Sequence, residues 1–179
     1  VFTPVDLSLG AGELLLVVGA NGSGKTTLLR LLSGLLDPAG DGRIDRQEPV
    51  CYVGHSAGIK DDLSVAENLA LMAAMATDQA VDVNAVAARL GLGGLERRAV
   101  RTLSAGQRRR CALGRLLVQP APLWLLDEPY ANLDVDGLAL IDTLIAEHLA
   151  GGGAVAMATH GAHRPPVEPR QTLTLGAAP

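Results

Sequence analysis

Aromatic residues are scarce in this chain of 179 residues and make up only 2% of it. They are Phe2, Tyr52, Trp124 and Tyr130. A platform that stacks single-stranded nucleic acid needs several exposed rings, and so does the aromatic belt of a membrane protein. The chain also has a formal net charge of −4, whereas a nucleic-acid-binding surface needs an excess of basic residues. We therefore expect no nucleic-acid partner.

The chain has only two cysteines and no long apolar run. Cys51 and Cys111 are isolated, with no C-x-x-C pair and no metal-like spacing, which indicates small buried groups in a reducing compartment. No apolar run approaches the ~20 residues that cross a bilayer, and no signal peptide is visible at the start. We expect a cytoplasmic chain that reaches a membrane only through a partner.

A glycine-rich loop is the strongest positive signal for nucleotide binding. It lies between a short apolar run at 14–18, typical of a buried parallel strand, and a predicted helix at 27–36. The loop fills every fixed position of the phosphate-binding pattern G-x-x-x-x-G-K-[ST], so an ordinary glycine-rich turn is the weaker reading. Its backbone N–H groups are expected to wrap the phosphates, Lys25 to contact the β- and γ-phosphates, and Thr26 to ligate Mg²⁺. The loop residues are Gly19, Ala20, Asn21, Gly22, Ser23, Gly24, Lys25, Thr26 and Thr27.

Two further apolar strands are predicted to end in polar side chains. Residues 123–126 lead into Asp127 and Glu128, and residues 154–159 lead to His160. The carboxyl ends of parallel strands face the ligand crevice, so Asp127 is expected to hold the Mg²⁺ shell and Glu128 to polarise the attacking water. A histidine at a strand end is, taken alone, more often a surface group. Its place after the third apolar strand favours contact with a γ-phosphate.

A second helix start with affinity for anions is predicted at Leu103-Ser104-Ala105-Gly106-Gln107. Ser104 is a good N-cap, and the small residues after it let the backbone approach another molecule. The free N–H groups and the helix dipole attract an anion. Since the chain already has one phosphate loop, the simplest interpretation is that this helix serves the nucleotide of a second copy. The arginines at 108–110 favour a solvated face or internal ion pairing over a phosphate patch.

The phosphate loop, the 103–107 segment, the Asp-Glu strand end and the final histidine together resemble an ABC-type ATPase domain over residues 19–160. The resemblance implies an α/β P-loop NTPase with a mostly parallel core sheet, a small antiparallel β part and an inserted helical subdomain. It implies ATP and Mg²⁺ as cofactors. Ser104, Gly106 and Gln107 of a second copy would close over the nucleotide, and Asp134 would be the acid of the loop that crosses the dimer interface, the D-loop.

The same resemblance implies one ABC ATPase domain over residues 1–179. Its nucleotide-binding core would be residues 1–60 and about 102–179, and its helical subdomain about 61–101. A hydrophobic content of 48% is ample for such a core. The periodicity predicts helices at 65–75 and 83–90, an edge strand along the alternating Val5, Leu7 and Leu9, and a last strand at 172–175.

His55 stands where the family usually has a glutamine. A neutral imidazole can ligate Mg²⁺ or accept a hydrogen bond from water much as an amide oxygen does, whereas haem ligation by His55 is the less economical reading. Four features together resemble one branch of the family, the ATP-binding subunits of haem exporters in cytochrome c biogenesis. They are Tyr52-Val53-Gly54-His55 followed by Gly58-Ile59-Lys60, the alanine at 105, the segment Leu-Trp-Leu-Leu-Asp-Glu-Pro at 123–129, and Asp-x-x-Gly at 134–137.

That branch implies a homodimeric ATPase bound to transmembrane permease subunits that handle haem, peripheral on the inner face of a bacterial cell membrane. The alternatives are an ATPase of another ABC importer or exporter, or a soluble ABC ATPase. Soluble repair types insert long coiled coils and translation types carry two such domains, and this chain has neither. A kinase would lack the 103–107 signature, and the Asn-Lys-x-Asp of a GTPase is absent.

Overall fold

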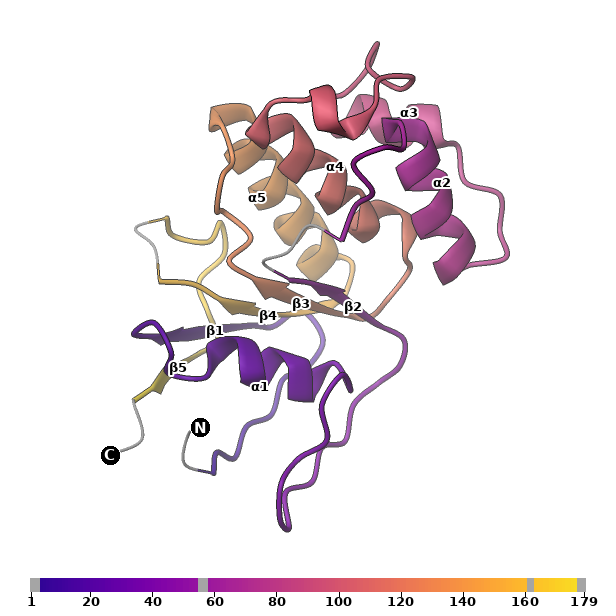
Figure 1. The fold of residues 1–179 in the computed structure, drawn as a ribbon. Helices are drawn as coiled ribbons and strands as arrows, with labels where there is room; N and C mark the ends of the chain where they lie inside the picture. Colours follow the sequence, from indigo (N-terminus) through magenta and orange to yellow (C-terminus); the bar gives the residue numbers. More distant parts are fainter. Residues whose placement is uncertain (1–3, 55–57, 161–162, 177–179) are drawn as a thin grey trace. The chain divides into compact units, whose positions relative to one another are not determined.

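The computed structural model describes residues 4–54, 58–160 and 163–176, and these form two compact units (Figure 1). The first unit holds a β-sheet and the helix that covers it, and the second is mainly helical. The first unit comprises Val1–His55, Ala121–Pro129 and Ile145–Pro179, and the second comprises Ser56–Pro120 and Tyr130–Leu144.

The sheet of the first unit has the strand order β2-β3-β4-β1-β5, and every neighbouring pair is parallel. Ala158 is in register with both Val17 and Asp127, so the carboxyl ends of the three central strands lie side by side. Ligands of open α/β sheets bind at this edge. The strands are β1 (Leu14–Gly19), β2 (Val50–Val53), β3 (Leu123–Asp127), β4 (Ala154–Ala158) and β5 (Gln171–Leu175). The predicted α/β class with a mostly parallel sheet is confirmed.

Helix α1 (Lys25–Leu32) lies along one face of this sheet (Figure 1). Its Leu28 and Leu29 are buried in a cluster with Leu15 and Val17 of β1. Burying each leucine stabilises the fold by about 2 kcal/mol. The helix is shorter than the predicted 27–36, because Gly34 follows its end at φ 77, a left-handed conformation that ends helices.

The edge strand predicted at Val5, Leu7 and Leu9 does not form, although these side chains are partly buried against the same cluster. Alternation predicts which side chains are buried, but a strand also needs a neighbouring backbone to pair with. In the described part of the chain, residues 4–10 pair with no strand, and β5 pairs with β1. Outside the named strands, Ser64 and Ala99 form an isolated antiparallel bridge.

The second unit contains three helices that pack on one another, α2, α3 and α4 (Figure 1). Ser64 caps the first through a capping box with Glu67, and Asp82 caps the second, which is why both begin where the sequence predicts. No helix of the described residues is long and apolar enough to span a bilayer. The helices are α2 (Val65–Ala76), α3 (Val83–Arg89) and α4 (Ala105–Val118), with a 3₁₀ turn at Val100–Thr102. A further helix, α5 (Val135–Ala150), belongs to the second unit up to Leu144 and to the first from Ile145.

The arginines at 108–110 do not form a solvated face, because Arg109 and Arg110 are buried. Internal ion pairing, the other interpretation of this run, holds for Arg108 and Arg110. Arg108 lies 3.8 Å from Asp61, and Arg110 lies 3.4 Å from Asp134. A guanidinium keeps its charge even when it is buried, and a buried charge is costly unless it is paired. Arg110 therefore needs a partner such as Asp134.

His148 of α5 stacks on Trp124 of β3, with ring centroids 3.8 Å apart and planes 6° from parallel. Burial lowers the pKa of His148 below its ordinary value. A histidine with a lowered pKa in the folded state resists protonation, so its contribution to stability is full above its unfolded pKa of about 6.5 and is lost as pH falls below it.

We therefore expect the melting temperature to fall more between about pH 7.5 and about pH 5.5 in the native chain than in His148→Phe. Phenylalanine keeps a ring against Trp124 but has no proton to gain. Differential scanning calorimetry at both pH values measures the two drops. Equal drops would contradict a role for His148.

Candidate functional site

The phosphate loop of the first unit curls around the ammonium group of Lys25. The buried Nζ donates to the carbonyl oxygens of Gly19 and Ala20, at 2.7 and 3.1 Å. A Cβ at Gly19 would collide with the Leu175 carbonyl oxygen and with the Ser23 hydroxyl, so only glycine fits there. The loop therefore holds a buried cation against its own backbone carbonyl groups.

Ser23 adds an unused polar group to this loop. Its Oγ is buried, and among the residues that the structure describes it has no hydrogen-bond partner. Buried hydroxyls are nearly always paired, so an unpaired one in a phosphate-binding loop points to a ligand. Of the other loop residues, Ala20, Asn21 and Gly22 are exposed, Gly24 is buried at the start of α1, and Thr26 and Thr27 are half-buried in its first turn.

Thr26 and Asp127 meet at the carboxyl edge of the sheet. Thr26 Oγ1 donates to Asp127 Oδ2 over 2.8 Å, and the carboxylate is buried. Two hard oxygen atoms suit Mg²⁺, which is usually held by one or two carboxylates together with substrate phosphates and water. No group of three or more His, Cys, Asp and Glu gathers in the described part of the chain. The pair fits Mg²⁺ of this kind, and the third predicted ligand, His55, lies outside the described residues.

Glu128 and His160 form the second polar pair at this edge. Glu128 Oε1 lies 2.6 Å from His160 Nδ1, and the two side chains are 17% and 58% exposed. Glu128 has φ 50, a left-handed conformation that is costly for a residue with a Cβ, while its N–H donates to the Ala158 carbonyl oxygen at 3.0 Å. Such strain persists where the surrounding structure imposes it, often at functional sites.

A cavity of about 310 Å³ lies next to these groups, within the size range of ligand pockets. Its lining includes apolar side chains of β1 together with histidine and arginine side chains. Gly19 of the phosphate loop and His160 both line this cavity, so the cavity borders both the phosphate loop and the Glu128–His160 pair. The lining residues are Leu16, Val18, Gly19, Thr159, His160, His163, Arg164 and Pro165.

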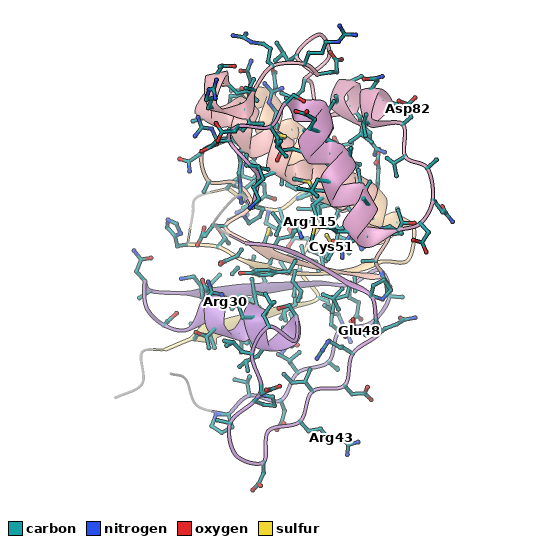
Figure 2. All side chains as sticks on the ribbon, turned by 45° about the vertical axis from the view of Figure 1, so that its right-hand side comes forward. Arg30, Arg43, Glu48, Cys51, Asp82 and Arg115 are labelled. Atoms are coloured by element: carbon teal, nitrogen blue, oxygen red, sulfur yellow. The ribbon has the colours of Figure 1, made fainter. Side chains whose placement is uncertain are left out.

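Tyr52 of β2 is a polar neighbour of the site that its sequence context did not reveal. It is in register with Leu125, two residues before Asp127, so the two side chains share a face of the sheet. Burial raises the pKa of the Tyr52 hydroxyl, the Arg30 guanidinium opposes this shift, and the Asp127 carboxylate adds to it. Figure 2 shows Arg30 on α1. Period-2 alternation along residues 50–53 is the signal that could have placed Tyr52 on this face.

The signature of the second unit begins α4 as the sequence predicts. Ser104 Oγ accepts from Gln107 N at 3.1 Å, and Gln107 Oε1 accepts from Ser104 N at 3.0 Å, which completes a capping box. A Cβ at Gly106 would lie 3.1 Å from Asp134 Oδ2. The signature and Asp134 therefore meet within the second unit, whereas the phosphate loop, Asp127, Glu128 and His160 belong to the first.

Residues 2–131 match a family model described as ABC transporter. The cytochrome c biogenesis ATP-binding export protein CcmA of Xanthomonas oryzae is 50% identical to the chain over 188 residues, which cover 99% of the chain and 88% of that protein. The protein of the same name from Methylococcus capsulatus is 47% identical, over 90% of the chain and 84% of its own length. A solved ATP-binding subunit of an ABC transporter has the same fold, with a TM-score of 0.75 at 22% identity over 86% of the chain and 70% of that structure. The chain therefore belongs to the ABC transporter family, as one of its ATP-hydrolysing subunits.

Proposed function

We propose that the chain works as a Mg²⁺-dependent homodimer that powers a membrane permease, and that the cargo is haem for cytochrome c maturation. The observation that carries the catalytic part is the pair of short contacts at one sheet edge, Thr26 to Asp127 and Glu128 to His160. They bring a metal-binding oxygen pair and a proton acceptor to strand ends that lie side by side.

The first unit supplies the groups for phosphoryl transfer to water. Lys25 and the loop N–H groups bind the phosphates. Thr26 and Asp127 would hold Mg²⁺, which would supply positive charge against the phosphates when bound. Glu128 orients the water for in-line attack. His160 donates to a γ-phosphate oxygen.

The contact between His160 and Glu128 affects this last role. Where Glu128 Oε1 accepts a hydrogen bond from the Nδ1–H of His160, the Nε2 of that imidazole carries no proton and is an acceptor. To donate to a phosphate oxygen, His160 must therefore turn its ring away from Glu128. We infer that ATP binding exchanges the Glu128 contact of His160 for a phosphate contact, which frees the carboxylate for water.

The second unit supplies the groups that would serve the other copy. The start of α4 presents N–H groups and a positive dipole end, and Ser104, Gly106 and Gln107 form it. These groups would close over the nucleotide of the partner copy, with Asp134 crossing the interface. His55 would complete the Mg²⁺ shell in place of the family's usual glutamine.

The cargo and the location come from the relatives' names and the branch resemblance. Relatives with 47% and 50% identity are named export proteins of cytochrome c biogenesis. We propose that this chain is likewise bound to a permease at the inner face of a bacterial membrane and that haem is what the permease handles.

Co-purification tests the cargo. We expect the tagged chain, isolated in mild detergent from its own cells, to retain an untagged membrane protein whose haem is measured as the pyridine haemochrome. A membrane protein without haem would favour the ATPase of another importer or exporter. Recovery of the chain with no membrane protein would favour a soluble ABC ATPase.

A further inference from the structure

Arg110 joins two parts of the second unit through its guanidinium group. Its side chain is 10% exposed, and Nη1 donates to the carbonyl oxygens of Leu90 and Gly91, at 3.4 and 3.2 Å. These carbonyls follow α3, where a cation is favourable against the helix dipole. A guanidinium keeps its charge even when it is this buried, and a buried charge must be paired. The partners of Arg110 therefore fix the position of its side chain.

The other terminal nitrogen of Arg110 contacts the D-loop. Nη2 donates to Asp134 Oδ2 at 3.4 Å, and Asp134 Oδ1 in turn accepts from Gly137 N at 2.9 Å in the first turn of α5. A single carboxylate therefore binds the signature helix through Arg110 and caps α5 through Gly137. The Asp134 side chain is 48% exposed, so much of it remains open to solvent.

Gly106 places the signature against the same carboxylate. Residues 106 and 110 are four apart on α4 and so lie on one face of the helix. A Cβ at residue 106 would approach Asp134 Oδ2 to 3.1 Å, which is a tight contact. The first turn of the signature, the Arg110 guanidinium and the Asp134 carboxylate are thus in contact within one chain.

We propose that Arg110 is a positioning residue that fixes Asp134 against the signature helix, so that the signature and the D-loop of one chain meet the second copy as one rigid surface. The proposal rests on the proposed function, because the shared site is what uses this surface. Arg110 acts only through Asp134. Without it, Asp134 keeps its cap on α5 but loses its attachment to α4.

Two conservative substitutions separate the Arg110–Asp134 contact from the rest of the structure. Arg110→Lys keeps the charge near the α3 carbonyls but removes the planar fork that reaches two groups at once. Asp134→Asn keeps an oxygen that can cap α5, since asparagine caps as well as aspartate, but removes the negative charge. Each is made alone, and both are made together.

We expect each single variant to lower kcat for ATP hydrolysis about ten-fold and to leave KM within about two-fold, because the phosphate loop is untouched. The kcat of the double variant should be no lower than that of the less active single variant, as expected for two residues that act through one contact. Arg101→Lys is the matched control, because Arg101 makes an exposed 2.9 Å pair with Asp62 and should keep the native kcat. Calorimetry should place every variant's melting temperature within about 2 °C of the native chain.

A native kcat in Arg110→Lys would overturn the proposal, and so would losses that multiply in the double variant. A drop in kcat that matches a drop in melting temperature would also overturn it, because it would show a merely structural role. Failure of the native chain to hydrolyse ATP would instead refute the proposed function.

Discussion

Replacing Glu128 by glutamine should lower kcat for ATP hydrolysis by about 100-fold to 1,000-fold while ATP still binds. The amide has the size of the carboxylate but cannot accept a proton from the attacking water. It also cannot form the charge-assisted contact that Glu128 Oε1 makes with His160 Nδ1 at 2.6 Å. Lys25, Thr26 and Asp127 stay in place, so the phosphates and Mg²⁺ should be held as before.

Phosphate release measures the loss, and size-exclusion chromatography with and without ATP measures association. Because the bound nucleotide is not consumed, an ATP-bound dimer should accumulate in Glu128→Gln and not in the native chain. Glu168→Gln, an exposed change of the same chemistry, is the control and should behave as the native chain does. Persistent turnover without a dimer would remove Glu128 from its assigned role.

Replacing Lys25 by methionine should weaken ATP binding by about 100-fold, which corresponds to about 2.7 kcal/mol. Methionine keeps the length of the side chain but has no charge to place against the phosphates. The loop also loses the two hydrogen bonds from Nζ to the carbonyl oxygens of Gly19 and Ala20, which order it. ATP hydrolysis at ordinary nucleotide concentrations should become undetectable.

Isothermal titration calorimetry with ATP measures the affinity. Lys60→Met is the control, since Lys60 is the only other lysine of the chain and is exposed in the second unit. Its affinity should equal that of the native chain. If Lys25→Met bound ATP as tightly as the control, the phosphate loop would not be the nucleotide site.

The strands and helix starts of the site could be predicted from short-range patterns. β1, β3 and β4 form where the apolar runs predicted them, and Ser104 caps α4, because both signals depend on residues close in sequence. The rule that ligands bind at the carboxyl ends of parallel strands predicts that Asp127 and the loop after β1 share one edge, and Thr26 Oγ1 lies 2.8 Å from Asp127 Oδ2 there. The roles of these residues in catalysis stay predictions.

Other features depend on contacts between residues that are far apart in the sequence, and short-range patterns do not predict these contacts. Val5, Leu7 and Leu9 have the alternation of a strand but no strand to pair with. Arg110 looks like one of three surface arginines until the ends of α3 and the D-loop are placed beside it. Tyr52 shares a face of the sheet with Asp127 only through the register of β2 with β3.

The two buried cysteines make the folded chain a clean background for site-specific labelling. Cys51 and Cys111 are fully buried, and burial raises the pKa of the Cys111 thiol to about 11, so little thiolate is present at neutral pH. Maleimides react with accessible thiolates and should therefore leave the native fold unmodified. A cysteine introduced on an exposed helix can then carry a spin label or a fluorophore by itself, and the spacing within the proposed homodimer can be followed through the ATP cycle with both native cysteines kept.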